Sequence, residues 1–126
     1  MLKISREEDL ALLLMAELSR RGNLSLSEWA KEKKLAYRFL SKIAGKLKLA
    51  GLIKSKEGRK GGYSLGKKVT VGQVFKAIEG EKGLVKCLRG EQCNALRFCR
   101  QGKILKKLNL VVERELNKTS LEELWR

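Results

Sequence analysis

The chain carries four motifs that are typical of the start of an α-helix. In each, a serine or threonine precedes a glutamate or glutamine by three positions, so that both side chains can satisfy backbone groups that a first helical turn leaves unpaired. The four pairs are Ser5 and Glu8, Ser25 and Glu28, Thr70 and Gln73, and Ser120 and Glu123. So many helix starts in 126 residues predict a mainly α chain. A chain of this length builds one compact core, so we expect a single domain.

Three helices are expected in the first half of the chain. Leucines at helical spacing follow Ser5 until Gly22, and a shorter helix follows Ser25. The third helix is expected over 36–50, before a left-handed exit at Gly51. One face of this helix is apolar and consists of Leu40, Ile43, Leu47 and Ala50. The opposite face is basic and consists of Arg38, Lys42 and Lys46. Short helices joined by tight turns indicate a helix-turn-helix unit.

A β-hairpin is expected directly after the third helix. The sequence LIKSKEGRKGGYSL predicts strands over 52–56 and 63–65, with Arg59 and Lys60 at the tip of a glycine-rich turn. We call this hairpin the wing. Residues 38–68 contain ten basic residues and one acid, a net charge of +9 within a chain of net charge +15. This concentration of charge next to a helix-turn-helix predicts a double-stranded DNA partner. The alternative is a solvated lysine face.

The C-terminal third predicts an interface between two copies of the chain. A helix is expected over 95–117, with a broad apolar stripe made of Ile104, Leu105, Leu108, Val111, Val112 and Leu116. One small domain has little core left to cover this stripe, and the same helix of a second copy would bury it. The alternative is packing within the chain.

The cysteines of the chain are Cys87, Cys93 and Cys99, and the chain contains no histidine. This spacing differs from that of zinc ribbons, and a mixed zinc site with histidine is excluded. Thiolate ligands in a loop with long spacers suit an iron–sulfur cluster. Neighbouring arginines and lysines favour the thiolate form. The alternative is a set of redox thiols that bind no cluster.

The stretch 39–80, followed by these cysteines, closely resembles the Rrf2 family of bacterial transcription factors, in particular its iron–sulfur-cluster and nitric-oxide-sensing branch. The most specific elements are AGLIKSKEGRKGGY and AIEG. The resemblance implies a winged helix-turn-helix with a long C-terminal dimerisation helix, and a homodimer on a palindromic operator. On matching positions, Ala36, Tyr37, Arg38 and Lys42 would face the major groove, and Arg59 would reach the minor groove. Residues 36 and 37 depart from the family pattern, so the operator sequence cannot be borrowed.

The resemblance also implies a ligand set for the cluster. Cys87, Cys93 and Cys99 match the family's cluster cysteines. The histidine that completes some family sites is replaced by Gly102, whereas the DLAL sequence around Asp9 matches an aspartate ligand of other members. Asp9 of the partner subunit is therefore the expected fourth ligand, with Glu8 as runner-up. Because the two-iron members use histidine, its absence favours a 4Fe-4S over a 2Fe-2S cluster.

Together these observations predict a cytoplasmic, homodimeric DNA-binding regulator, expected to be a repressor, that senses redox state, nitric oxide or iron supply. The chain shows no membrane span, no secretion signal and no nucleophile and base arrangement of an enzyme. The expected parts are a winged helix-turn-helix over 1–80, a cluster loop over 81–102 and a dimerisation helix with tail over 103–126. The alternatives are a cluster-free regulator that uses redox thiols, zinc or a small effector, and an electron-transfer iron–sulfur protein.

Overall fold

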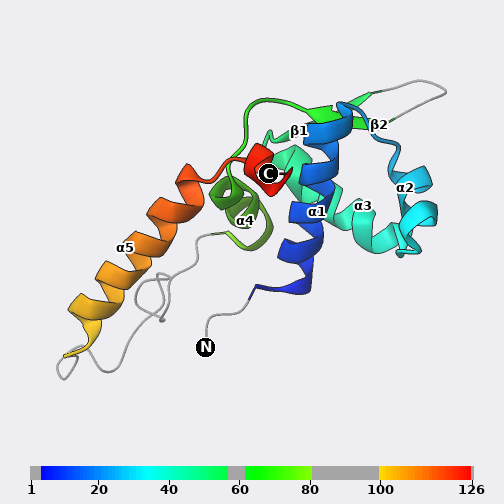
Figure 1. Ribbon diagram of the computed structural model, residues 1–126. Coiled ribbons are helices and arrows are strands. Elements are labelled where there is room, and N and C mark those ends of the chain that lie inside the picture. Colours follow the sequence, from blue (N-terminus) through cyan, green and yellow to red (C-terminus); the bar gives the residue numbers. More distant parts are fainter. Residues whose placement is uncertain (1–3, 57–61, 81–99, 126) are drawn as a thin grey trace.

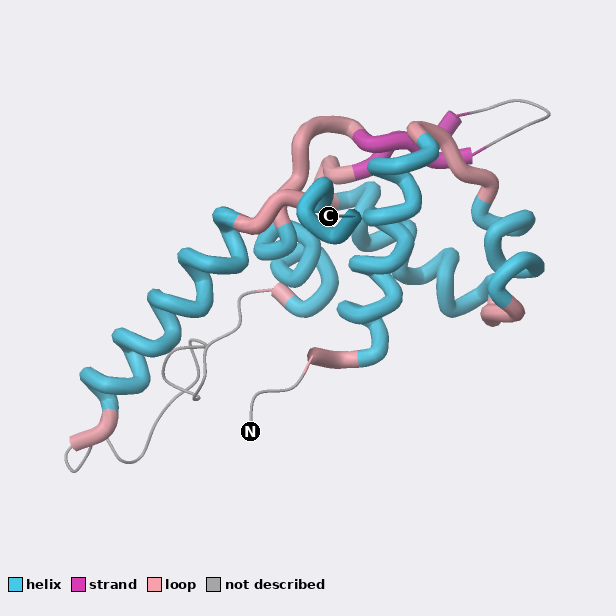
Figure 2. Tube along the Cα trace, viewed as in Figure 1, coloured by secondary structure: helices cyan, strands magenta, loops and turns pink. Residues whose placement is uncertain are grey.

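The computed structural model describes residues 4–56, 62–80 and 100–125 (Figure 1). In chain order its elements are α1 (Arg6–Arg21), α2 (Leu26–Lys33), α3 (Tyr37–Leu49), β1 (Ile53–Lys56), β2 (Gly62–Leu65), α4 (Val71–Glu79), α5 (Gly102–Lys118) and the 3-10 helix η2 (Leu121–Trp125). The mainly helical prediction is confirmed, and so are the bounds of the first helices and of the wing to within about one residue. Figure 2 shows the two strands together at one end of the described molecule.

One core joins the helices and the root of the wing. Its fully buried side chains come from α1, α2, α3, β1 and α4, and the largest of them are Trp29, Leu14, Met15, Leu18, Leu40, Ile43, Leu47, Ile53 and Val74. Three residues of the apolar stripe expected on the third helix face this core, because Leu40, Ile43 and Leu47 are fully covered. Ala50, the fourth, is exposed just after the helix ends. α1 packs against both α3 and α4. The helix-turn-helix is therefore held on a scaffold to which α1 and α4 contribute.

The wing is anchored to the turn between α1 and α2. β1 and β2 pair antiparallel with Ile53 opposite Leu65, and Leu24 extends the sheet by exchanging two backbone hydrogen bonds with Tyr63 (3.0 and 2.8 Å). A β-carbon on Gly62 would lie 2.7 Å from the Leu24 carbonyl oxygen, so only glycine fits this approach. The hairpin consequently has a fixed direction relative to α3.

The C-terminal tail folds back onto the core. The backbone N–H of Val71 donates to the Thr119 carbonyl (2.9 Å), and that of Leu121 donates to the Val69 carbonyl (3.3 Å). Leu121 is buried at 3% exposure, in contact with the same core as α1. η2 therefore fastens the end of α5 to the body of the domain.

α5 extends away from the rest of the described molecule in Figure 1. It contacts α4 near its C-terminal end, where Gly72 lies so close to Asn117 that a β-carbon would overlap the Asn117 side chain. The expected start near residue 95 lies outside the described residues. Residues 100 and 101 are not helical, however, and α5 begins at Gly102. The prediction that the helix already includes residues 100 and 101 is therefore wrong.

The capping motifs differ in outcome. Both reciprocal hydrogen bonds form in the pairs Ser5–Glu8 and Thr70–Gln73, as predicted. The capping box predicted at Ser25 and Glu28 does not form. Ser25 precedes α2, but its side chain makes no capping bond, and its hydroxyl lies 3.3 Å from the Ser27 hydroxyl. At Ser120 the backbone N–H donates to Glu123 (2.7 Å), and the helix that follows is 3-10. Among the described residues, no helix is long and apolar enough to cross a bilayer.

Candidate nucleic-acid interface

The outer face of α3 is exposed where its inner face is buried. Ala36 is the residue before the helix, and Tyr37, Arg38 and Lys42 follow on its solvent side, with Tyr37 53% exposed and the Lys42 side chain 61% exposed. All four candidate reading residues are thus accessible to a partner. An exposed helix face with aromatic and basic side chains suits the width and the negative potential of the DNA major groove.

The turn between α2 and α3 fixes the direction of this face. Lys34 takes a left-handed conformation (φ 56°), and the Leu35 backbone N–H donates to the Ala30 carbonyl (2.9 Å). Leu35 then packs against the core and leaves Ala36 to start α3. This left-handed residue could not be predicted from its type, because glycine and asparagine are the usual occupants of such a cap.

Basic side chains continue from α3 along the root of the wing. Lys48, Lys54, Lys67 and Lys68 are exposed in the described part of the chain. The expected tip residues Arg59 and Lys60 lie outside the described residues, so their predicted contact with the minor groove stays a prediction. The described cations and the exposed face of α3 nevertheless supply the charge that attracts a phosphate backbone.

Glu7 is a residue of this surface that the sequence analysis missed. It lies in the first turn of α1 and forms ion pairs with Lys42 (3.3 Å) and Lys46 (2.9 Å) of α3. These two ammonium groups, Lys46 foremost, hold the pKa of the Glu7 carboxyl below its usual range. A first-turn glutamate carries an ordinary interaction with the helix dipole, so only the three-dimensional fold singles it out.

The predicted ligands of an iron–sulfur cluster are only partly described. Cys87, Cys93 and Cys99 lie outside the described residues. Asp9 is exposed in the first turn of α1, whereas Glu8 is 1% exposed and its carboxylate accepts the Ser5 backbone N–H (2.9 Å). Within the described residues no group of three or more potential ligands comes together. The prediction that a capping box occupies Glu8 is confirmed, which makes Asp9 the more accessible carboxylate.

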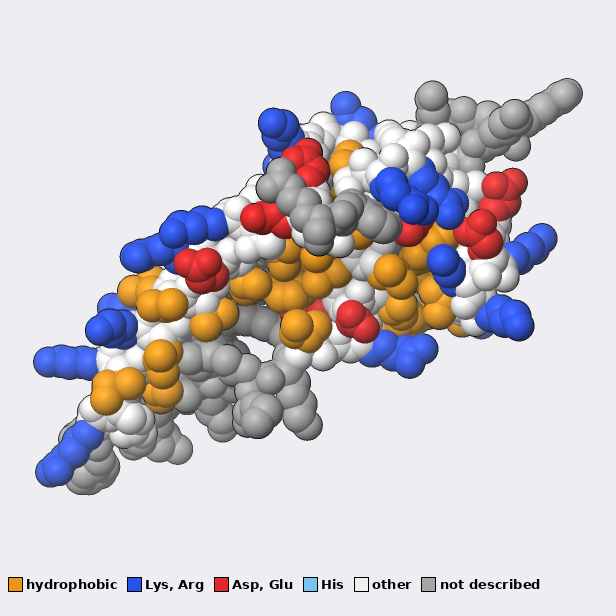
Figure 3. Space-filling model, in the orientation of Figure 1, with side chains coloured by type: hydrophobic (Ala, Val, Ile, Leu, Met, Phe, Trp, Pro, Cys, Tyr) orange, Lys and Arg blue, Asp and Glu red, His pale blue; other side chains and the backbone are white. Residues whose placement is uncertain are grey.

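Most of the apolar side of α5 is exposed, and only Leu105 and Leu116 of the predicted stripe are half-buried. None of its 17 residues is buried, and the exposed apolar residues are Ile104, Leu108, Leu110, Val111 and Val112. Leu110 is also 50% exposed, but it is two residues along the helix from Leu108 and therefore lies on another side of α5 than the predicted stripe. Figure 3 shows hydrophobic side chains continuing from α5 onto the body of the molecule. A continuous apolar surface of this kind marks an interaction site.

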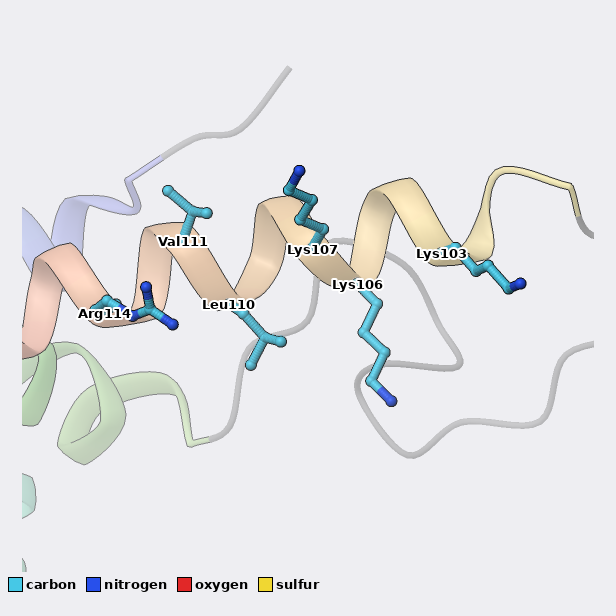
Figure 4. A pocket seen from close by; sticks show the side chains of 6 residues that line it. All are labelled: Lys103, Lys106, Lys107, Leu110, Val111 and Arg114. Atoms are coloured by element: carbon cyan, nitrogen blue, oxygen red, sulfur yellow. The ribbon is translucent and has the colours of Figure 1, made fainter.

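A shallow pocket of about 340 Å³ lies along α5. Figure 4 shows Lys106 and Leu110 pointing to one side of the helix, and Lys107 and Val111 to the other. Lys103 and Arg114 complete the lining. The lining therefore consists of four cations and two apolar side chains, which suits an amphipathic partner that carries acidic groups.

Comparisons with known proteins agree with this architecture. The sequence profile of a family described as "Rrf2: Iron-dependent Transcriptional regulator" matches residues 4–126. The chain is 33% identical to the HTH-type transcriptional regulator CymR of Bacillus subtilis over 97 residues, which cover 72% of this chain and 70% of CymR. It is 29% identical to the HTH-type transcriptional regulator IscR of Aliivibrio salmonicida over 117 residues, which cover 90% of this chain and 70% of IscR.

A solved structure is similar over nearly the whole chain. It is that of CymR, described as the global cysteine regulator of B. subtilis, with a TM-score of 0.80 and 30% identity. The match covers 98% of this chain and 96% of that one. The winged helix-turn-helix fold that the sequence predicted is confirmed.

Proposed function

The chain belongs to the Rrf2 family of transcriptional regulators, and from this membership we propose that it is a homodimeric repressor that binds a palindromic operator and carries an iron–sulfur cluster. Like its relatives, the chain is a transcriptional regulator and not an enzyme. The observation that carries the DNA-binding proposal is the exposed face of α3, where Tyr37, Arg38 and Lys42 stand on a helix whose other side is fully buried.

DNA binding is tested by the salt dependence of affinity. A dimer that contacts 6 to 10 phosphates should show a log-log slope of about −5 to −9 against salt concentration, measured by fluorescence anisotropy on a labelled duplex. Replacing Arg38 by alanine should lower the affinity for a selected sequence by about 1 to 3 kcal/mol if it contacts a base edge. A flat salt dependence would contradict the proposal.

The homodimer is supported by the uncovered stripe of α5. Leu108, Val111 and Val112 of this stripe are 38–49% exposed. Leaving this apolar surface in water is unfavourable, and a second α5 provides a matching apolar face. Pairing of two α5 helices through this stripe would also place the α3 helices of the two protomers apart from each other. Such a separation is required for binding to the two half-sites of a palindrome.

The distribution of charge on α5 favours an antiparallel pair. Its N-terminal half carries Lys103, Lys106 and Lys107, and its acids, Glu113 and Glu115, lie in the C-terminal half. An antiparallel copy would place these acids beside Lys103, Lys106 and Lys107, three of the cations that line the pocket in Figure 4. A parallel copy would instead place lysine beside lysine.

The cluster proposal rests on the donor set and on the exposure of Asp9. Cys87, Cys93 and Cys99 would supply the thiolates, and Asp9 of the partner subunit the carboxylate. When bound, such a cluster has an iron whose carboxylate ligand is more replaceable than its thiolate ligands, which suits a sensor of redox state, nitric oxide or iron supply. We propose 4Fe-4S rather than 2Fe-2S, because the chain has no histidine.

The position of Asp9 suggests how such a site would reach DNA. Asp9 lies in the same helical turn as Glu7, which is bonded to Lys42 and Lys46 of α3. A force on this turn would act directly on α3. Coupling of about 2.7 kcal/mol is enough to change operator affinity by a factor of about 100.

The cluster is tested by anaerobic purification followed by absorbance and Mössbauer spectroscopy. Brown protein that loses its colour after replacement of any one cysteine by alanine would support it. Asp9→Ala should keep the colour but reduce the difference in DNA affinity between protein with and without the cluster. Glu8→Ala should cost about 1 kcal/mol of stability and leave the spectrum unchanged. If the two variants exchange these effects, Glu8 is the ligand.

A second candidate is a cluster-free regulator that uses redox thiols, zinc or a small effector. The observation in its favour is the similarity to CymR in both sequence and structure, CymR being described as a global cysteine regulator. Colourless anaerobic protein with one tightly held zinc per chain would favour the zinc form of this candidate. Colourless, metal-free protein whose DNA affinity changes on oxidation would favour the thiol form.

A further inference from the structure

Glu7 lies on α1, outside the helix-turn-helix, yet it contacts the helix expected to enter the groove. Its two carboxylate oxygens are divided between two lysines of α3. Oε1 accepts Lys42 at 3.3 Å, and Oε2 accepts Lys46 at 2.9 Å. One acid of α1 therefore forms ion pairs with two of the cations on α3.

The two lysines are held to different degrees. The Lys46 side chain is 35% exposed, makes the shorter bond to Glu7 and also donates to the Ile78 carbonyl of α4 (3.3 Å). The Lys42 side chain is 61% exposed, and its ion pair within the described part of the chain is the longer bond to Glu7. Lys46 is thus the fixed counterion of Glu7. Lys42 is the one that can turn toward another anion without leaving Glu7 uncompensated.

We propose that Glu7 is a specificity-determining residue, which orders Lys42 for sequence recognition and withholds its charge from DNA of random sequence. The inference rests on the proposed DNA-binding function. A lysine that is ordered before binding loses less conformational freedom when it reaches a base edge or one particular phosphate. An adjacent carboxylate also reduces the attraction of the same lysine for any passing phosphate.

These two effects predict opposite consequences of removing the carboxylate. In Glu7→Gln, Lys42 loses its ion pair and becomes a mobile charge in each protomer of the dimer. Affinity for DNA of random sequence should rise, and the log-log salt slope should become steeper by about 1 to 2. Affinity for the preferred sequence should not rise in proportion, because the lysine must now be ordered on binding. We expect the ratio of specific to non-specific affinity to fall about tenfold.

The experiment uses the full chain and two DNA probes. Wild-type protein first selects a sequence from a library of random duplexes. Anisotropy titrations then compare the selected duplex with a shuffled duplex of the same composition over a range of salt concentrations. The matched control is Glu122→Gln, which removes the same charge from an exposed glutamate of η2. This control should change both affinities by one common factor.

Lys42→Gln supplies the second variant. It should lower the specificity ratio by itself, and Glu7→Gln added to it should change the ratio no further, since both changes remove one interaction. The inference is overturned if Glu7→Gln shifts both probes equally, as the control does. It is equally overturned if the effect of Glu7→Gln on the ratio persists without Lys42, or if Lys42→Gln leaves the ratio unchanged. Failure of the wild type to select any sequence would instead refute the proposed function.

Discussion

α3 and α5 are both amphipathic helices with lysines beside an apolar stripe, but they differ in whether that stripe is buried. In α3, Leu40, Ile43 and Leu47 are fully buried. In α5 no residue is buried, and Leu108 is 49% exposed. The cause lies in their neighbours. α3 packs against α1, α2, β1 and α4, whereas α5 contacts α4 near one end.

The comparison shows what an amphipathic pattern can establish. The pattern indicates that a helix has a partner, but it does not indicate whether the same chain or another copy provides it. The polar faces differ as well. Lys42 and Lys46 of α3 are paired with Glu7 of α1, whereas Lys103, Lys106 and Lys107 of α5 line an open pocket. The following changes test this contrast, beginning with the largest expected effect.

Leu47→Ala in α3 should lower the free energy of unfolding by about 2 to 5 kcal/mol, because the side chain is fully buried and its removal leaves a cavity. The measurement is a urea titration followed by circular dichroism, at one fixed protein concentration so that dimer formation contributes equally. Leu49→Ala is the matched control, since Leu49 is 91% exposed at the end of the same helix. A large loss in the control would contradict the assignment of the faces.

Leu108→Asp in α5 should weaken the proposed dimer and leave the fold of each protomer intact. Placing a charge in a buried interface costs about 2 kcal/mol or more, so the dimer dissociation constant should rise by about 30-fold or more. Sedimentation velocity over a range of concentrations measures this constant. Leu110→Asp makes the same change at a leucine of equal exposure that points to the other side of α5 from Val111 (Figure 4). If that variant weakens the dimer as strongly, the stripe is not the interface.

Much of the fold could be predicted because its signals are local. Capping motifs, glycines at helix ends and the apolar period of the third helix located α1, α3 and the wing to within about one residue. The start of the C-terminal helix was predicted wrongly at residues 100 and 101, since an apolar stripe does not mark where a helix begins. The motif at Ser25 failed as well, because sequence spacing does not fix the rotamer of a hydroxyl.

The candidate site was predictable where it follows from the helix period alone. Exposure of Tyr37, Arg38 and Lys42 follows from burial of the opposite face. The ion pairs of Glu7 join residues 35 and 39 positions apart, and no local pattern could reveal them. The left-handed conformation of Lys34 was not predicted for a different reason. It depends on the packing of Leu35 against the core and not on the residue type of Lys34.

Replacing Gly72 of α4 and Gly45 of α3 by alanine should change the stability of the protein in opposite directions. A β-carbon at Gly72 would overlap the Asn117 side chain of α5, so Gly72→Ala should cost about 1 to 3 kcal/mol and disturb the crossing of α4 and α5. Gly45 is exposed within α3, with nothing within 4 Å of an added β-carbon. Gly45→Ala should therefore stabilise the protein by about 1 kcal/mol. Thermal unfolding of the two variants side by side decides the matter, and equal signs would contradict the packing described at α4.

The smallest expected difference separates two helix starts with the same sequence motif. Ser5→Ala removes the side-chain oxygen that accepts the Glu8 backbone N–H (3.1 Å), and it should cost about 1 kcal/mol. Ser25→Ala removes a hydroxyl that makes no capping bond, so its effect should stay within about 0.5 kcal/mol. Urea titrations of both variants at one protein concentration measure the difference. An equal loss at Ser25 would mean that its capping box forms in solution, and that α2 is held at its start in the same way as α1.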